Sequence, residues 1–433
     1  METEQTGYTS YPISCHDIAL QSVVTYGFIV DGHLHRLRLK NSLEKLIVNQ
    51  WNILGARIGK NAQDRFEYRV PSAFNDEVEA FSFDSQTLST PLSDHFQIPP
   101  PTSQPSLFTA SPSVIFEPPA HLKHDHLSSY EKSSQPILHL QVMQFSADEK
   151  EKEKTSIGLT VPQCFCDAGG IREILSAWSS VLAKGGITED IPTLADGMML
   201  EKIEPEVASH EALDTLWTHH SLNEIPADAP SPSDEREVAK WMFMPTETLA
   251  RLTRESQDEL AADGYDVLVG EADVLLAWWT KTIYSTNSPD VQNSLLAVSI
   301  PLDLRSRLPA FANQTYLHNA IHMATHVLPS SSSVAEISLS QLALALRTTI
   351  RLATSEEITR ALAYKTQTYY STKDHSTVAT LSPPGSEEFM LSNWLDMNWI
   401  LEDSIDFRPA LMGQDRSFTI VCDQRKGERA GRG

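Results

Sequence analysis

Apolar residues along the chain follow two different spacings, which divide it into strands and helices. Continuous or alternating apolar runs predict strands at 22–30, 66–70, 137–145, 156–161, 241–244 and 295–302, with shorter candidates at 390–393 and 419–422. Apolar residues at three- and four-residue steps predict helices at about 37–54, 171–182, 273–284 and 341–355, and another that begins at 246. Strands and helices therefore alternate in both halves, which is typical of an α/β fold.

Two stretches interrupt this pattern and suggest how the chain is divided. Residues 82–135 are rich in Pro, Ser, Thr and Asp, and predict an irregular surface insertion with one short strand at 113–116. Residues 186–236 are acidic and contain several prolines, as a connection between lobes does. We therefore expect an N-terminal lobe at 1–185, a connection at 186–236 and a C-terminal lobe at 237–433. The basic end of the chain predicts a short, disordered and truncated tail.

Charge and composition narrow the class of protein. The chain of 433 residues has 34 Lys and Arg against 57 Asp and Glu, a net charge of −23, which argues against a nucleic-acid partner. It has no apolar run of the ~18 residues that a membrane span requires, and its first residues do not resemble a signal peptide. Its four cysteines are too scattered for a disulfide scaffold or a metal site. We expect a soluble, monomeric, cytoplasmic protein without a metal.

Several short sequence patterns occur in a fixed order along the chain. They are LKNSL at 39–43 with ILGARI at 53–58, QCFCDAGG at 163–170, ADVLLAWW at 272–279, DLRSRL at 303–308, YLHN at 316–319 and IDFRPA at 405–410. Together they resemble the motifs of the BAHD-type acyl-CoA-dependent acyltransferases, in the fungal natural-product branch. The resemblance extends from about residue 14 to 411.

This resemblance implies a fold and an activity. The fold is two-lobed, like chloramphenicol acetyltransferase, with a mixed sheet flanked by helices in each lobe and a channel between the lobes. The activity is transfer of an acyl group from acyl-CoA, a co-substrate rather than a bound cofactor, to a hydroxyl of a hydrophobic terpenoid, polyketide or alkaloid. In the family motif H-x-x-x-D, the His removes the proton from the acceptor, and the Asp fixes the loop through an arginine.

The residue in place of the family's His is Gln163, four positions before Asp167. A carboxamide has no lone pair basic enough to take a proton near neutral pH, and a general base is typically worth ~10²–10⁴-fold in rate. Three readings stay open: acyl transfer that persists with another base, a channel reused for cyclisation or isomerisation, and a decayed accessory protein.

Other groups near the motifs are candidates for a substitute base. His318 stands where the family has Gly in Y-x-G-N, and we expect His322 to follow one helical turn later on a partly exposed turn. Cys164 and Cys166 follow Gln163, and their alternative role is that of small, half-buried strand residues. His139 is expected to be a packed strand residue.

The remaining motif residues are expected to hold the site together. By resemblance, Asp167 pairs with Arg305 or Arg307, unless Asp406 takes one of those arginines. Asn319 and Phe407 are expected to be structural. The pair Gly169 and Gly170 is expected to allow positive φ and close approach to a ligand such as acyl-CoA at the start of the following helix. Arg408 replaces a Gly of the closing motif, so the turn there should differ.

Overall fold

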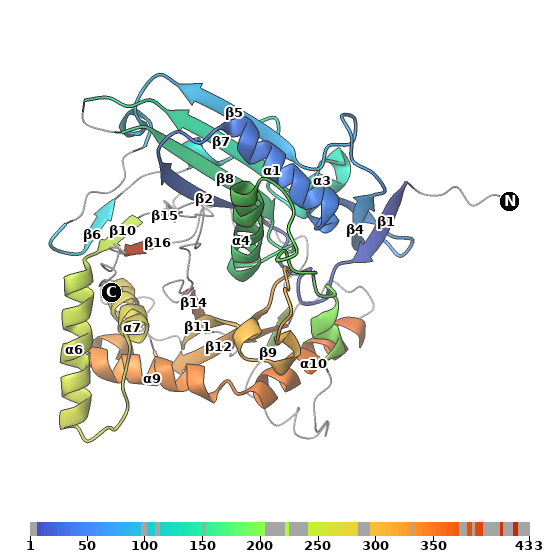
Figure 1. Cartoon of the computed structure of the whole chain (residues 1–433). Coiled ribbons are helices and arrows are strands. Elements are labelled where there is room, and N and C mark those ends of the chain that lie inside the picture. The colour runs from blue at the N-terminus through green and yellow to red at the C-terminus, as the bar shows by residue number, and fades with distance from the viewer. Residues whose placement is uncertain are drawn as a thin grey trace.

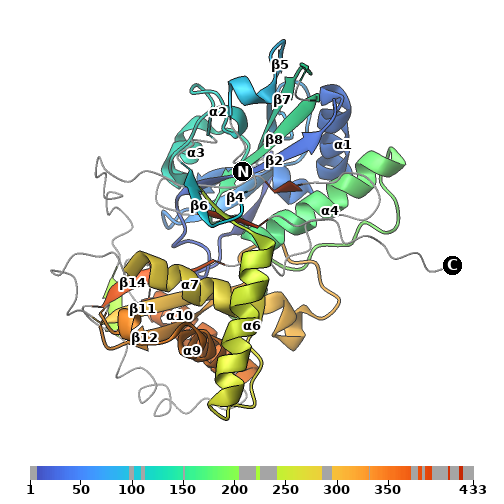
Figure 2. The ribbon, with the colours of Figure 1, turned by 90° about the vertical axis from the view of Figure 1, so that its left-hand side faces the viewer.

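Two stacked halves, each with its own sheet and helices, make up the computed structural model (Figures 1 and 2). The structure describes residues 7–96, 102–108, 113–149, 152–203, 221–224, 241–284, 295–330, 332–371, 379–382, 386–392, 408–409 and 419–422. The mixed α/β architecture predicted from the alternation of strands and helices is confirmed.

The upper half in Figure 1 contains a five-stranded and a three-stranded sheet. The larger sheet has the order β15 (Arg408–Pro409), β2 (Val23–Asp31), β8 (Lys154–Pro162), β7 (His139–Phe145) and β5 (Ser82–Leu88). The smaller sheet has the order β1 (Tyr8–Pro12), β4 (Phe66–Pro71) and β3 (Arg57–Lys60). The helices of this half are α1 (Arg36–Asn49), α2 (Ser113–Phe116), α3 (Leu127–Ser133) and α4 (Ala168–Lys184), with 3₁₀ turns η1 (Asn52–Gly55) and η2 (Leu92–Asp94).

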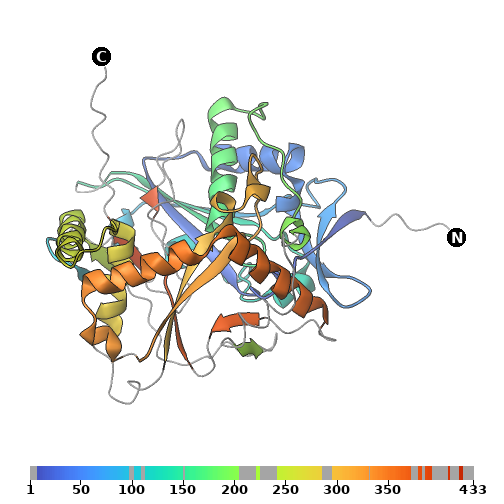
Figure 3. The same cartoon turned by 90° about the horizontal axis from the view of Figure 1, so that it is seen from below.

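The lower half is built around a three-stranded sheet and a group of long helices. The sheet has the order β12 (Ile321–Leu328), β11 (Leu296–Asp303) and β14 (Glu387–Met390). The helices are α6 (Thr246–Ala262), α7 (Glu271–Tyr284), α8 (Ser333–Glu336), α9 (Leu339–Leu352) and α10 (Ser355–Ser371). Short 3₁₀ turns lie at η3 (Met199–Lys202), η5 (Leu304–Ser306) and η6 (Pro309–Phe311), and β9 (Ser221–Glu224) pairs with β13 (Ala379–Ser382). Seen from below, the orange helices α9 and α10 cross the underside of this half (Figure 3).

Segments are also exchanged between the halves. Strand β15, from the end of the chain, pairs antiparallel with β2 of the upper half. Strand β6 (Ser106–Phe108) pairs with β10 (Trp241–Met244), which in turn pairs with β16 (Thr419–Cys422). These exchanges tie the two halves together through backbone hydrogen bonds.

The core of the upper half explains why α1 and α4 form where they do. Each helix places apolar residues at three- and four-residue steps against the sheet and its partner: Leu39, Leu43, Leu46 and Ile47 on α1, and Ile171, Ile174, Leu175 and Trp178 on α4. The buried Trp178 donates from Nε1 to the Ser42 hydroxyl at 2.8 Å. The five-stranded sheet therefore has a rigid helical cover, and α4 has a fixed direction.

The insertion expected at 82–135 is only partly irregular, and the prediction of a strand at 113–116 is wrong. Residues 82–88 form β5 at the sheet edge, and 113–116 form the short helix α2. Helix α2 covers the sheet face opposite α1, where Phe116 is buried against Gly27 and Gly158. A short apolar run does not distinguish a buried strand from a buried helical turn.

The prediction for His322 is also wrong: the residue lies on strand β12, not one helical turn after His318, and its side chain is buried. Cys164 and Cys166 lie in the turn after β8 rather than on a strand, and both are fully buried. Strand β8 ends where its pairing with β2 ends, and β12 begins where its pairing with β11 begins; neither pairing can be read from the local sequence.

The two halves of the molecule approach each other closely at Gly170, and substitution of this residue tests that contact. A Cβ at this position would lie 1.9 Å from the Leu317 carbonyl oxygen, which is backbone and has little freedom to move. We predict that Gly170→Ala destabilises the fold by about 1–3 kcal/mol or more, in spite of the better helix propensity of Ala. Urea unfolding followed by circular dichroism measures this change.

The control is Gly186→Ala, since a Cβ there meets nothing within 4 Å. Its free energy of unfolding should stay within about 0.5 kcal/mol of the parent. Equal stability of both variants would contradict the close approach at Gly170.

Candidate functional site at the junction of the two halves

The turn between β8 and α4 carries the residues expected at the site, Gln163 to Asp167. It begins where the β2–β8 ladder ends, because the Gln163 backbone N–H donates to the Ser22 carbonyl at 2.8 Å. It ends at Asp167, whose side chain caps α4 by accepting from the Gly170 N–H at 2.8 Å. Asp at an N-cap satisfies one of the free N–H groups of the first helical turn.

Asp167 forms a buried, two-pronged ion pair with Arg305 of the other half. Arg305 donates from Nη2 to Oδ1 at 2.9 Å and from Nη1 to Oδ2 at 3.1 Å. The Ala320 N–H also donates to Oδ2, at 2.8 Å. The side chains of Asp167 and Arg305 are only 5% and 14% exposed, so this pair carries its charges inside the protein. The pairing with Arg305 that the motifs imply is present.

Arg305 also hydrogen-bonds to the backbone of its own half, just before Ala320. Its Nε donates to the Tyr316 carbonyl at 3.0 Å, and its Nη2 donates to the His318 carbonyl at 2.8 Å. One guanidinium therefore fixes both the Asp167 turn and residues 316–318.

Arg307 does not share this role, so that alternative is wrong. Its guanidinium faces the carbonyls of Ile350 and Ala353 at the end of α9, at 3.4 Å each. The other alternative partner, Asp406, lies outside the described residues, as does Phe407.

The expected role of Gly169 and Gly170 needs correction. Neither is among the positive-φ glycines of the described residues. They are required for close approach within the protein: a Cβ on Gly169 would lie 2.4 Å from Arg305 Nη1, and one on Gly170 would meet the Leu317 carbonyl. The two glycines therefore let the lower half reach the turn, and a role in binding acyl-CoA stays a prediction.

Residues 318 and 319 contact the turn at two further points. His318 Nδ1 donates to the Phe165 carbonyl at 3.0 Å, and Asn319 Nδ2 donates to the Gln163 carbonyl at 3.0 Å. The backbone of the turn is therefore held from both ends and from its middle.

His318 is buried rather than partly exposed, contrary to expectation. Its ring stacks on Tyr68 with centroids 5.7 Å apart and packs edge-on against Phe165 and Tyr316. Burial lowers the pKa of His318 to about 4, from an ordinary value near 6.5. The imidazole is therefore neutral near pH 7 and a weak base.

Asp17, which none of the sequence motifs includes, is buried beside the site. Its Oδ1 accepts from both the backbone N–H and the Nδ2 of Asn319, at 3.2 and 2.9 Å. Burial raises the pKa of Asp17 well above its usual range. Because Asn319 also donates to the Gln163 carbonyl, Asp17 acts on position 163 through this amide. A single Asp outside every motif, between β1 and β2, offers no sequence signal for such a role.

Gln163 itself is half-buried, and Ser22, also outside the sequence motifs, holds its side chain. The Ser22 hydroxyl donates to Gln163 Oε1 at 2.5 Å. So far as the chain is described, no ionisable side chain hydrogen-bonds to Gln163.

Cys164 and Cys166 are poor nucleophile candidates. Burial raises the pKa of the Cys164 thiol to about 12 and that of Cys166 well above its usual range. A buried thiol of this kind is inert. The other histidine candidate, His322, is buried on β12, and burial lowers its pKa to about 4 as well.

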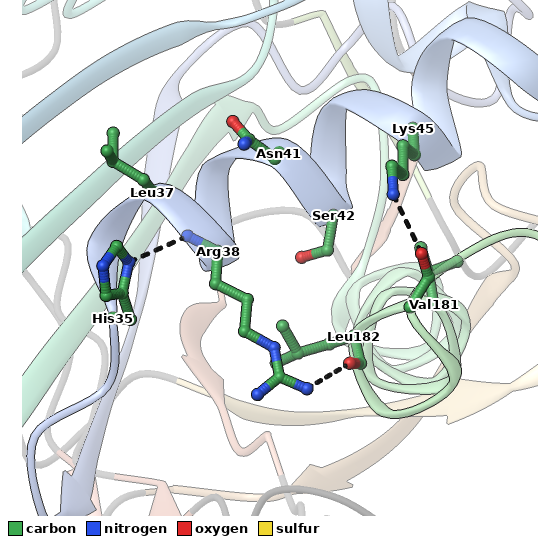
Figure 4. A pocket seen from close by; sticks show the side chains of 9 residues that line it. His35, Leu37, Arg38, Asn41, Ser42, Lys45, Val181 and Leu182 are labelled. Atoms are coloured by element: carbon green, nitrogen blue, oxygen red, sulfur yellow. Dashed lines mark hydrogen bonds between the residues drawn. The ribbon is translucent and has the colours of Figure 1, made fainter.

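A groove of about 460 Å³ lies far from this site, between α1 and the end of α4 (Figure 4). It contains Arg38 and Lys45, but these donate to the Leu182 and Gly185 carbonyls at the C-terminal end of α4. Cations favour that end of a helix dipole, so they need no ligand to explain them. The groove is about 22 Å along α4 from Asp167 at 1.5 Å per residue.

Two classes of structural feature are absent from the described residues. No cluster of three or more His, Cys, Asp or Glu side chains in them is arranged to hold a metal ion. None of their helices combines the length and apolar character of a membrane span.

Comparison with known proteins assigns the chain to a family. Residues 118–407 match the profile of the Transferase family. The chain therefore belongs to this family, that of the BAHD-type acyltransferases, as the sequence motifs predict.

Several curated relatives match along most of the chain. Acetyltransferase adrJ of Penicillium roqueforti is 27% identical over 92% of this chain and 81% of its own length. Acetyltransferase sphE of Aspergillus fumigatus is 26% identical over 89% of this chain and 78% of its own. O-acetyltransferase PaAT-2 of Phomopsis amygdali is 22% identical over 94% and 84%.

Solved structures confirm the fold. The F. graminearum TRI101 complex with coenzyme A and deoxynivalenol superposes with a TM-score of 0.66 at 14% identity, over 94% of this chain and 89% of that one. Vinorine synthase superposes with a TM-score of 0.57 at 13% identity, over 98% and 89%. At these identities the likeness shows the fold alone.

The buried ion pair generates a stability prediction. Asp167→Ala leaves the buried Arg305 charge with only the half-exposed Asp303 as a carboxylate partner among the described residues, and we expect a loss of about 3–5 kcal/mol in the free energy of unfolding. Adding Arg305→Met to that variant should cost less than the sum of the two single changes. Chemical denaturation of the three variants measures both effects.

The control for this prediction is Arg251→Ala, which breaks the exposed pair with Glu255 on α6. Exposed pairs of this kind are worth about 0.3–0.5 kcal/mol. A melting temperature for Asp167→Ala no lower than that of the control would reject the structural role of the pair.

Burial of His318 generates a pH prediction. Between pH 6.5 and 4 the unfolded chain protonates this residue and the folded protein does not, so stability falls as the pH falls through that window. With a folded-state pKa of about 4, the loss from His318 is on the order of 3 kcal/mol at the low end of this window. His318→Gln should therefore reduce the difference in unfolding free energy between pH 7 and pH 4.5. Identical pH dependence of parent and variant would contradict this.

Proposed function

We propose that this chain is an acyl-CoA-dependent O-acyltransferase that modifies a hydroxyl of a hydrophobic secondary metabolite. Membership of the Transferase family and the names of its fungal relatives support acyl transfer. TRI101 binds coenzyme A in its solved complex, which supports acyl-CoA as the donor here. The acceptor class, a terpenoid, polyketide or alkaloid, follows from the fungal natural-product branch that the motifs resemble.

The observation that carries this proposal is the turn that holds position 163. Arg305, His318, Asn319 and Ala320 all bind the turn from the other half of the molecule. An enzyme that holds its reacting groups in a fixed geometry gains rate by orienting the substrate. In this proposal Asp167 anchors the turn, Gln163 faces the substrates, and the lobes at 1–185 and 237–433 enclose them, with the connection at 186–236 between.

A second candidate function rests on Gln163 itself. An amide cannot act as the base that the family motif supplies. The alternative is therefore a non-acylating enzyme, a cyclase or isomerase, that uses the same site, or an accessory protein that only binds the metabolite. We also propose that the protein is monomeric and cytoplasmic. These two proposals follow from the composition of the sequence.

Acyl transfer can be measured directly. The full chain, incubated with acetyl-CoA and a panel of terpenoid, polyketide and alkaloid hydroxy compounds, should release CoA thiol and give products heavier by one acetyl group. Gln163→His should raise transfer to alcohols by ~10²-fold or more, because it supplies a general base. Thiol release and mass spectrometry follow the two products independently.

Binding separates the alternatives. An acyltransferase should be stabilised by CoA, by about 2.7 kcal/mol at 100 times its Kd. No thioester cleavage by parent or Gln163→His, together with no stabilisation by CoA, would reject acyl transfer. Stabilisation by a metabolite alone would then support the non-acylating alternatives.

A further inference from the structure

Gln163 is oriented by its hydrogen bonds. The Ser22 hydroxyl donates to its Oε1 at 2.5 Å, and its backbone N–H donates to the Ser22 carbonyl at 2.8 Å. A separation as short as 2.5 Å fits O–H···O rather than N–H···O. Oxygen Oε1 is therefore occupied, and the Nε2 group, with two N–H donors, has no acceptor among the described residues. This half-buried side chain thus has Oε1 held by Ser22 and presents the N–H donors of Nε2.

The surroundings of Gln163 provide no substitute base among the described residues. His318 donates from Nδ1 to the Phe165 carbonyl, and burial of its ring among three aromatic side chains makes its remaining nitrogen, Nε2, a weak base. Asp17 reaches position 163 only through Asn319, which occupies Asp17 Oδ1 with two N–H groups. The two thiols of the turn are fully buried. So far as the described residues go, proton removal from an acceptor is therefore left to solvent.

We propose that Gln163 donates a hydrogen bond to the carbonyl oxygen of the acyl thioester, and that the acceptor is an acidic hydroxyl, a phenol or an enol, which ionises without a base on the protein. This inference rests on the proposed acyl transfer and names its acceptor class. A phenol ionises with a pKa of about 10, as in tyrosine, whereas an aliphatic alcohol, like water, has a pKa more than about five units higher. Near neutral pH the phenol thus supplies about 10⁵-fold more anion.

The reaction balances with these parts alone. The phenol or enol loses its proton to water, and the resulting oxyanion attacks the thioester carbon. A C–O bond forms, and the carbonyl oxygen becomes an oxyanion that the Gln163 Nε2–H group stabilises. The C–S bond then breaks, CoA leaves as a thiolate that takes a proton from water, and the ester remains. One donor aimed at such an oxyanion is typically worth ~10²–10³ in kcat.

A matched pair of acceptors tests the inference. 2-Naphthol and decahydro-2-naphthol share a carbon skeleton and differ in the acidity of the hydroxyl. With acetyl-CoA and the full chain, after subtraction of the rate without protein, acylation of 2-naphthol should be at least 10²-fold faster. Its rate should rise about tenfold per pH unit between pH 6.5 and 8.5, following the acceptor's own ionisation.

Substitutions at the site separate the donor from a base. Gln163→Leu should lower kcat for 2-naphthol by ~10²–10³ with little change in KM. Ser22→Ala should lower it by about tenfold, whereas Ser22→Thr, which keeps the hydroxyl, should retain it. Gln163→His should extend the reaction to decahydro-2-naphthol. Gln63→Leu, an exposed Gln outside the site, should change nothing, and melting curves confirm that each variant folds.

Two results would overturn the inference while leaving acyl transfer intact. One is equal acylation of both naphthol compounds by the parent protein. The other is a rate with 2-naphthol that does not change with pH, which would indicate a base on the protein. Absence of thioester cleavage with every acceptor, together with no binding of CoA, would reject the proposed function and this inference with it.

Discussion

The buried pair of Asp167 and Arg305 is the constraint on which the rest of the site depends. Each charge costs several kcal/mol to remove from water, so the pair persists only where further hydrogen bonds satisfy it. Asp167 accepts from two backbone N–H groups as well as from the guanidinium, and Arg305 donates to two backbone carbonyls. The two halves of the molecule therefore meet in one register, because any displacement would leave a buried charge unsatisfied.

This register also fixes position 163, independently of the side chain found there. The backbone of the turn is held by Ser22, Asn319 and His318, and the closest approach, at Gly170, leaves no room for a Cβ. The scaffold and the chemistry of the site are thus separable. In the proposed function, a change of the side chain at 163 would alter whether the site removes a proton or donates a hydrogen bond, and would leave the backbone of the turn in place.

Elements with strong local patterns could be predicted from the sequence. Strand β10 has the predicted bounds, and α7 begins two residues before the predicted residue 273. Both predictions were close because each element contains a continuous apolar run. Elements that depend on a distant partner were missed. Residues 113–116 are helical because Phe116 fills the space above Gly27 and Gly158, and β5 forms at 82–88 because β7 offers it a parallel edge.

For the site, the sequence by itself determined which residues are present: a Gln in place of the expected base, an Asp four positions later, and a choice of two arginines. Only the tertiary structure decided that Arg305 takes the pair and Arg307 does not, that His318 is buried, and that Asp17 and Ser22 belong to the site. The physical reason is that burial and hydrogen-bond direction depend on segments more than 100 residues apart in the chain. Residue spacing within one segment carries no information about them.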